Sequence, residues 1–320
     1  MYIQSFITFT MHSNKNLLSI TDLTQSEILS ILQKAEQFRK EKDANVKHEQ
    51  ILTGKSIAMF FEKPSLRTKV SFDSAVSSLG GNAILIDGRE VAGTRESISD
   101  ISNVLTGMVD GIFARVHEHS ILSEMKRDMN IPVLNALCND FHPFQALAEI
   151  QTVMIQFPED FLKKKIIFIG DGCNVPTSLA QICAILGIDF EMCSPDEYKI
   201  PEIFWTEILE LAEKSGAKVT TSNNVKKSAK NADVIVTDTW VSMGMEEEKE
   251  KRLHDFKDFG VTAEIMKRTN KDSIFLHCLP AYRGFEVSSE VIDGKQSKVF
   301  QEAHCRLHTS KAVLDFIYNS

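Results

Sequence analysis

The sequence has no uninterrupted apolar run of the roughly 18 residues that a membrane-spanning helix needs, so we expect no membrane span. It also has no excess of basic residues, because 36 Lys and Arg face 44 Asp and Glu for a net charge of −8. This balance argues against a broad surface for nucleic acid or anionic lipid, but it allows a local pocket for an anion. The six cysteines include no CxxC pair, so we expect reduced thiols rather than a disulfide framework.

The first ten residues, MYIQSFITFT, have no basic start and carry polar residues among the apolar ones, unlike a secretory signal peptide. Met11 is a second candidate for the translation start. These features predict a soluble, cytoplasmic protein with neither a membrane nor a nucleic acid as its partner.

The chain is long for one hydrophobic core: 320 residues, of which 43% are hydrophobic, favour two domains. Short apolar runs typical of buried strands alternate with segments of helical periodicity, the first of which opens with a Thr24–Glu27 capping box. This alternation predicts an α/β fold with two doubly wound parallel-sheet domains, helices on both faces and a junction near residue 150. Strands are expected at 56–61, 83–86, 111–116, 132–135, 166–169, 190–193, 232–236 and 273–276, and helices at 17–40, 69–79, 97–106, 145–156 and before Gly187.

Ligands of open parallel sheets bind beyond the carboxyl ends of the strands, and the segments there are unusually polar. After the strand 56–61 come Ser65, Arg67 and Thr68 at the start of a helix, where free backbone amides and the positive helix end favour an anion. Arg115 and His142 follow two further strands, so both should reach the same sheet edge. These residues predict a site for a phosphate-like ligand.

Two other site classes fit less well. Gly170-Asp-Gly172 follows a strand as a dinucleotide fingerprint would, but Val175 stands where the third glycine should be, and no Walker motif occurs. The histidines of 115–119 and His142 have no cysteine or carboxylate at ligand spacing, which makes a poor zinc site. The densely charged segment 246–257 is typical of a solvated helix or loop.

Several segments, in this order along the chain, resemble the signature motifs of the ornithine carbamoyltransferases. The resemblance runs from about Leu17 to the end, and the first motif is shared with aspartate carbamoyltransferases, whereas the later ones separate the two branches. The motifs are Pro64-Ser-Leu-Arg-Thr-Lys-Val-Ser-Phe72, His142-Pro-Phe-Gln145, Asp238-Thr-Trp-Val-Ser-Met-Gly244, His277-Cys-Leu-Pro280, Glu302-Ala303 and Arg306-Leu-His308.

The resemblance implies a carbamoyl phosphate domain at 17–147, joined by the C-terminal helix at about 301–320, and an ornithine domain at 148–300. It implies carbamoyl transfer from carbamoyl phosphate to the δ-amine of L-ornithine within arginine metabolism, in a homotrimer or a multiple of trimers, with no cofactor and no metal. The implied carbamoyl phosphate residues are Ser65, Leu66, Arg67, Thr68, Arg115, His142, Gln145, Cys278, Leu279 and Arg306; the implied ornithine residues are Asn174, Asp238, Ser242 and Met243; and the implied catalytic residues are Arg115, His142 and Cys278.

The chain departs from the family pattern at Leu66, Lys69, Val91, Cys173 and His304-Cys305. The resemblance implies that Val91 stands where the family has a Gln that reaches a neighbouring subunit's ligand, and Arg89, Thr94 and Arg95 are the nearest candidates to replace it. Three alternatives stay open: a catalytically weak paralogue that acts as a binding or assembly subunit, a carbamoyltransferase for another amine, and a nucleotide-dependent enzyme. The sequence does not decide between citrulline synthesis and the reverse direction.

Overall fold

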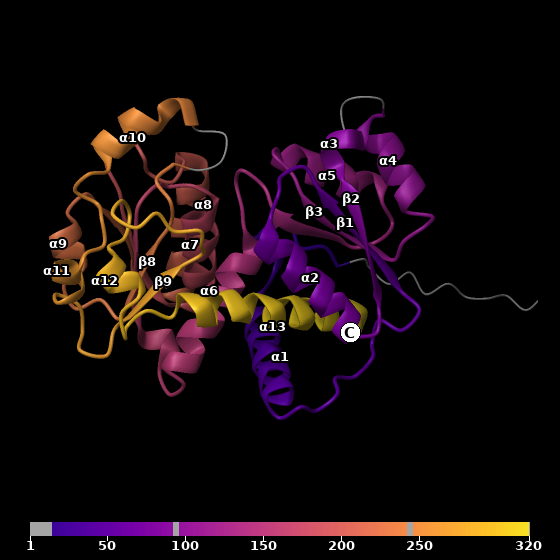
Figure 1. The fold of residues 1–320 in the computed structure, drawn as a ribbon, viewed down its shortest axis with the longest axis horizontal. Coiled ribbons are helices and arrows are strands. Elements are labelled where there is room, and N and C mark those ends of the chain that lie inside the picture. Colours follow the sequence, from indigo (N-terminus) through magenta and orange to yellow (C-terminus); the bar gives the residue numbers. More distant parts are fainter. Residues whose placement is uncertain (1–14, 92–95, 242–245, 320) are drawn as a thin grey trace, which may run out of the picture.

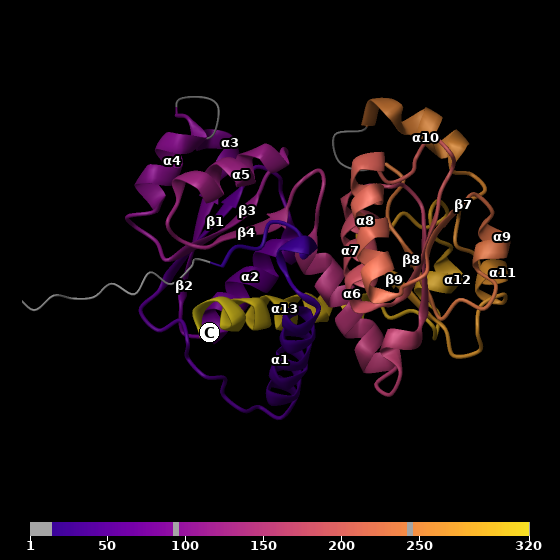
Figure 2. The ribbon, with the colours of Figure 1, turned by 180° about the vertical axis from the view of Figure 1, so that it is seen from behind.

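The computed structural model describes residues 15–91, 96–241 and 246–319, which form two lobes lying side by side (Figures 1 and 2). Each lobe is built around one sheet whose strands are all parallel, with helices packed on it. The α/β fold class predicted from the alternation of strands and helices is therefore confirmed.

The sheet of the first lobe has the strand order β2-β1-β3-β4. In it, Phe61 at the end of β1 lies beside Arg115 at the end of β3, so the residues that follow these strands emerge at one edge. The strands are β1 (Ser56–Phe61), β2 (Asn82–Asp87), β3 (Gly111–Arg115) and β4 (Val133–Leu137).

The sheet of the second lobe has the order β7-β6-β5-β8-β9. Ile169 at the end of β5 pairs with Thr237 at the end of β8, which in turn lies beside His277 at the end of β9. The strands are β5 (Lys165–Ile169), β6 (Asp189–Cys193), β7 (Val219–Ser222), β8 (Val234–Thr237) and β9 (Ile274–His277).

The helix ends follow local capping chemistry. Thr24 Oγ1 accepts a hydrogen bond from the Glu27 backbone N–H, and the Glu27 carboxylate accepts one from the Thr24 N–H, as the predicted capping box requires. Gly187 ends its helix in the left-handed region at φ 78°. The helices are α1 (Gln25–Asp43), α2 (Leu66–Ser78), α3 (Gly88–Val91), α4 (Ile98–Leu105), α5 (His119–Asp128), α6 (Pro143–Gln156), α7 (Asn174–Leu186), α8 (Glu202–Ser215), α9 (Val225–Ser228), α10 (Lys249–Asp255), α11 (Ala263–Met266), α12 (Ser289–Ile292) and α13 (Val299–Tyr318), with short 3-10 turns at Ile20–Asp22, Phe161–Lys163 and Glu246–Glu248.

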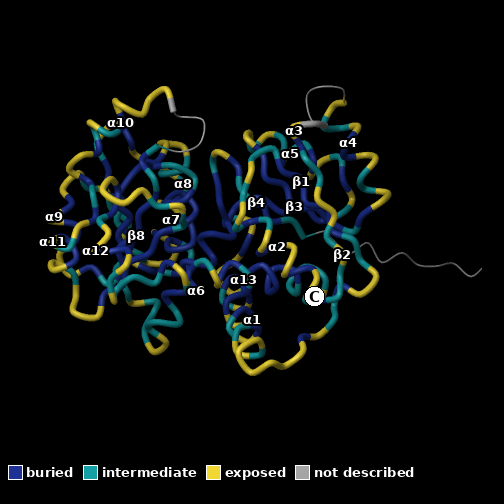
Figure 3. Tube along the Cα trace, viewed as in Figure 1, coloured by how far each residue is buried: buried dark blue, intermediate teal, exposed yellow. Residues whose placement is uncertain are grey.

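Two helices, α6 and α13, join the lobes. The last helix, α13, crosses from the second sheet to the first lobe and packs against α1, α2 and α6 (Figure 1). Phe72, Phe113 and Phe144 pack against one another in the first lobe with ring centroids 4.0–5.6 Å apart. They belong to a buried cluster that also contains Phe168 of the second sheet. Figure 3 shows this buried interior continuing between the lobes, so one shared core fixes how the two sheets face each other.

The sequence analysis did not predict α5, α8 and β7, nor the four-residue helices α3, α9, α11 and α12. Strand β7 is short, polar and on the sheet edge, and α8 buries only Ile208 and Ala212, so both lack the continuous apolar signal of an interior element. None of the helices in the described part of the chain combines the length and hydropathy of a membrane span.

Candidate active site

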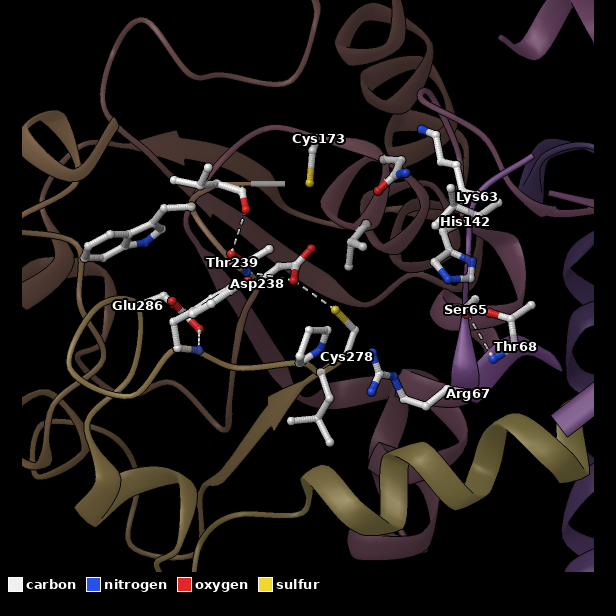
Figure 4. Close-up of a pocket in the computed structure, with 18 of the residues that line it drawn as sticks. Lys63, Ser65, Arg67, Thr68, His142, Cys173, Asp238, Thr239, Cys278 and Glu286 are labelled. Atoms are coloured by element: carbon white, nitrogen blue, oxygen red, sulfur yellow. Dashed lines mark hydrogen bonds between the residues drawn. The ribbon is translucent and has the colours of Figure 1, made fainter. Parts of the chain in front are cut away.

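The carboxyl ends of the strands from both sheets open onto one cleft of about 620 Å³ between the lobes (Figure 4). This is the place where ligands bind in open parallel sheets, and the volume suits a small-molecule site. Among the predicted site residues of the described chain, the cleft is lined by Ser65, Leu66, Arg67, Thr68, Arg115, His142, Asn174, Asp238, Cys278, Leu279 and Arg306.

The first wall is the start of α2. Ser65 caps this helix, because its Oγ accepts a hydrogen bond from the Thr68 backbone N–H at 3.3 Å. Leu66 is 74% exposed at the mouth of the cleft, and the Arg67 side chain points inward toward Cys278 (Figure 4). The free amides of the first turn and the positive helix end therefore face the same space as a guanidinium.

Two more guanidiniums meet at the buried hydroxyl of Thr68. Its Oγ1 accepts hydrogen bonds from Arg306 Nη2 at 3.0 Å and from Arg115 Nη1 at 3.5 Å. Neither arginine forms a salt bridge within residues 15–91, 96–241 and 246–319. The Nε atoms of both are buried and have no hydrogen-bond partner there.

The electrostatics of these arginines show how strongly the site favours an anion. Burial, together with the neighbouring charges of Arg306 and Arg67, lowers the pKa of Arg115 to about 10. Burial also lowers the pKa of Arg306 to about 10. Both remain charged at neutral pH, so three mutually repelling cations are held close together, and none of them has a salt-bridge partner in the described part of the chain.

His142 stands at the start of α6 and is almost fully buried at the cleft (Figure 4). Burial lowers its pKa well below the usual value, and the charges of Arg306 and Arg115 act in the same direction. The imidazole is therefore neutral at physiological pH. Its Nδ1 has no partner in the described chain, while its backbone N–H donates to Ser178 Oγ at 2.8 Å and fixes the start of the helix.

Gln145 does not line the cleft, although the sequence analysis placed it with the ligand residues. Its Oε1 accepts a hydrogen bond from Arg306 Nη1 at 2.9 Å, and its Nε2 donates to Glu302 at 2.6 Å and Glu149 at 3.2 Å. Gln145 therefore holds Arg306 from behind in this structure.

The acidic pair behind Gln145 was not recognised as part of the site from the sequence. Burial raises the pKa of Glu302 to about 7, and burial together with the charge of Glu302 raises the pKa of Glu149 well above its usual value. Glu302 also accepts a hydrogen bond from the His277 backbone N–H at 2.8 Å, so it ties α13 to the second sheet. Glu302 was marked in the sequence only by the Glu302-Ala303 motif, with no role attached, and Glu149 only by being a carboxylate within an apolar helix.

The second wall follows β8 and β9. Asp238 Oδ1 accepts hydrogen bonds from the Thr239 backbone N–H at 2.7 Å and from the Cys278 thiol at 3.0 Å (Figure 4). Burial raises the pKa of Cys278 well above its usual value, and the adjacent Asp238 raises it further. Cys278 is thus a protonated thiol and not a thiolate nucleophile.

Leu279 and Asn174 complete the described part of this wall. Leu279 has a φ of 57°, and its N–H donates to the His277 ring at 2.9 Å, which turns the chain into the cleft. Asn174 starts α7 and donates to the Cys138 carbonyl of the first lobe at 2.6 Å, so it bridges the two lobes. Ser242 and Met243 lie outside the described residues.

The glycine-rich segment after β5 has a packing role instead of a dinucleotide role. A Cβ on Gly172 would come within 2.2 Å of the Lys199 backbone, so only glycine fits there. Asp171 accepts a hydrogen bond from Arg252 Nη1 at 2.8 Å in a largely buried ion pair. The charged segment 246–257 is therefore not wholly solvated, because Arg252 is buried.

The fold and the site together define a two-domain enzyme that binds an anionic small molecule between parallel α/β lobes. Residues 15–154 match the model of the aspartate/ornithine carbamoyltransferase carbamoyl-P binding domain, and residues 162–317 match that of the Asp/Orn binding domain. The chain belongs to the aspartate/ornithine carbamoyltransferase family, which confirms the resemblance found in the sequence.

Relatives and solved structures of this family match nearly the whole chain. An ornithine carbamoyltransferase of Methanococcus maripaludis strain C5 is 42% identical over 309 residues, covering 95% of this chain and 99% of its own. The ornithine carbamoyltransferase structure from Pyrococcus furiosus matches with a TM-score of 0.92 and 37% identity, covering 96% of this chain and 98% of its own. The anabolic enzyme from Campylobacter jejuni matches with a TM-score of 0.90 and 38% identity, covering 95% and 99%.

Proposed function

We propose that this protein is an ornithine carbamoyltransferase, which transfers the carbamoyl group of carbamoyl phosphate to the δ-amine of L-ornithine and gives L-citrulline and phosphate. The observation that carries this proposal is the meeting of Arg67, Arg115 and Arg306 at the start of α2, opposite a carboxylate on the other wall. The names of the relatives support the choice of ornithine as the acceptor.

The phosphate group of carbamoyl phosphate binds at the first wall. The helix start and Ser65 supply neutral donors, and Arg67 and Arg115 supply charge-assisted ones. Phosphate binding relieves the repulsion among the arginines, since the dianion offsets their charge. Arg306 is held by Thr68 and Gln145 and keeps its position when the ligand arrives.

The carbamoyl group lies beside His142. A neutral imidazole can donate one N–H to the carbonyl oxygen without adding another cation to the site, which fits its lowered pKa. When the δ-nitrogen attacks, a C–N bond forms, negative charge grows on that oxygen, and the C–O bond to phosphate breaks. Arg115 and His142 then stabilise the oxyanion, Arg67 stabilises the departing phosphate, and the proton released by the amine passes to phosphate or water.

Ornithine binds against the second wall. Asp238 suits its α-ammonium group, and Asn174, with Ser242 and Met243, suits the remaining α-substituents. Cys278 and Leu279 lie near the reacting nitrogen, where the protonated thiol acts by packing and hydrogen bonding and forms no covalent intermediate.

Each lobe is assigned one of the two substrates. We assign carbamoyl phosphate binding to residues 17–147 with the C-terminal helix at about 301–320, and ornithine binding to residues 148–300. The packing of α13 against α1, α2 and α6 supports including this helix with the first lobe.

We further propose a homotrimer, or a multiple of trimers, that works in the cytoplasm in arginine biosynthesis. Support for an assembly comes from apolar side chains left exposed on the adjoining α2 and β2: Leu66, Val70, Ile84 and Leu85. Val91 is the last residue of α3, and Arg95 lies outside the described residues.

Steady-state assays of the purified chain test the proposal, with carbamoyl phosphate as donor and ornithine, acetylornithine or aspartate as acceptor. The proposal expects turnover with ornithine at least about 100-fold above the other two, because acetylornithine lacks the free α-ammonium that the buried polar wall would pair and aspartate lacks the δ-amine. Preferred turnover of acetylornithine or aspartate would move the chain to another acceptor. Binding of carbamoyl phosphate without any turnover would favour the catalytically weak paralogue.

A further inference from the structure

A second cluster of ligating side chains lies just outside the cleft, at the turn that leads from β4 to α6. It consists of His119, Cys138 and Asp140, whose ligand atoms all lie within 4.8 Å of one another. His119 is the first residue of α5, Cys138 follows β4 directly, and Asp140 lies in the turn two residues before His142.

We propose that His119, Cys138 and Asp140 form a binding site for a thiophilic divalent cation of the zinc type, with water as the fourth ligand. Nitrogen, sulfur and carboxylate oxygen are the donor set that such ions prefer, and three protein ligands leave one position open. From the sequence alone, the histidines make a poor zinc site, because no cysteine or carboxylate stands at ligand spacing. The fold corrects this, because it brings the missing cysteine and carboxylate from the end of the next strand.

The geometry fits the ion closely. Cys138 Sγ and His119 Nδ1 are 3.5 Å apart. A tetrahedral zinc with Zn–S of about 2.3 Å and Zn–N of about 2.05 Å places these two atoms about 3.5 Å apart. The third ligand needs only a small approach, since Asp140 is half-buried and its side chain can turn toward the other two.

The surroundings of Cys138 provide an independent observation. The Asn135 amide Nδ2 donates a hydrogen bond to the Cys138 sulfur at 3.5 Å, and burial raises the pKa of the unliganded thiol. An amide donor directed at the sulfur is an outer contact of the kind that supports a metal-bound thiolate. When the ion binds, the sulfur–metal bond replaces the S–H bond and the proton passes to water.

The site is also orientated and accessible. The His119 ring packs edge-on against Phe141, with centroids 5.0 Å apart at 80°, so its Nδ1 is fixed toward the sulfur. Cys138 is fully buried, whereas His119 and Asp140 are half-exposed and leave a route for the ion. A bound ion would tie the start of α5 to the turn that carries His142.

Cobalt(II) binding to the metal-free full chain tests the proposal, because thiolate ligation gives Co²⁺ a charge-transfer absorption band. Asp238, His277 and Cys278 also bring ligand atoms within 4.8 Å in the cleft, so the titration is done in the Cys278→Ser variant. We expect one Co²⁺ per chain with a thiolate band, and displacement of that band by Zn²⁺.

Further substitutions in this background locate the ion. Adding Cys138→Ser or His119→Gln should abolish the band, and adding Asp140→Asn should weaken affinity by at least the roughly tenfold that loss of an outer partner of a metal ligand costs. Cys193→Ser is the matched control, since Cys193 is buried outside both clusters and its loss should change nothing. Absence of the band before these changes, or its survival in both the Cys138→Ser and His119→Gln variants, overturns the proposal. His119→Gln, at a half-exposed position, decides the matter if Cys138→Ser fails to fold.

Discussion

Replacing Arg67 by alanine should remove most of the affinity for carbamoyl phosphate while leaving the ligand-free protein at least as stable as before. Arg67 points into the cleft and has no salt bridge within the described chain, so its side chain does little for the fold. Its charge instead opposes those of Arg115 and Arg306, and it lowers the pKa of both. The truncation therefore relieves repulsion in the empty site.

The loss of affinity follows from the partial burial of the site. Truncating one partner of a desolvated, hydrogen-bonded charge pair costs about 2–5 kcal/mol. At about 1.4 kcal/mol for each factor of ten, this corresponds to a Kd increase of roughly 30- to 4,000-fold. Arg115 and Arg306 remain in place, so the upper end of this range is expected only if Arg67 carries most of the contact with the phosphate.

Calorimetry gives the Kd and a melting curve without ligand gives the stability. Lys69→Ala is the matched control, because it removes a cation from the same helix at a residue that does not line the cleft, and its Kd should stay within about twofold of the parent. An unchanged Kd in the folded Arg67→Ala variant would refute the placement of the phosphate. A clearly lower melting temperature would refute the view that the three arginines repel one another in the empty site.

Three further predictions concern turnover. Ornithine should exceed putrescine in kcat/KM by up to roughly 10⁴-fold, because putrescine leaves the buried Asp238 without its α-ammonium partner, and equal values would remove that role. Activity should rise with pH through about 8, because a free δ-amine resembles Lys with a pKa near 10.4. His142 does not produce this rise, since its lowered pKa keeps it neutral throughout, and a flat profile from pH 6 to 9 with chemistry limiting would argue against attack by the free amine. Finally, Arg95→Ala or Arg89→Ala should lower kcat/KM for carbamoyl phosphate at saturating ornithine more than Val91→Ala does. Wild-type kcat/KM values in both arginine variants would contradict the hypothesis that an arginine replaces the missing amide.

Much of the fold could be predicted from local sequence. Buried parallel strands such as β1 and β5 are continuous apolar runs, and α1 carries its own start signal at Thr24, so their positions need no tertiary information. Strand β7 and helix α8 escaped prediction because their burial is partial and comes from neighbours that are distant in sequence.

The site was predictable where a polar residue ends a strand or directly follows it, as with Arg115 at the end of β3 and Asp238 after β8. It was not predictable where a contact depends on the path of α13. The bond from Gln145 to Glu302 joins residues 157 positions apart, and nothing local to either residue indicates that Gln145 holds Arg306. The His119–Cys138 contact escaped for the same reason, since it needs β3 and β4 to be neighbours.

The most direct test of the central claim is to follow the new bond itself. The full chain is incubated with ¹³C-labelled carbamoyl phosphate and δ-¹⁵N-labelled ornithine, and the product is observed by NMR. The proposed function predicts a one-bond ¹³C–¹⁵N coupling at the δ-nitrogen, formed at the rate at which phosphate is released and lost in Arg67→Ala at low donor concentration. Release of phosphate without this coupling, or a carbamoyl carbon attached to the α-nitrogen, would contradict it.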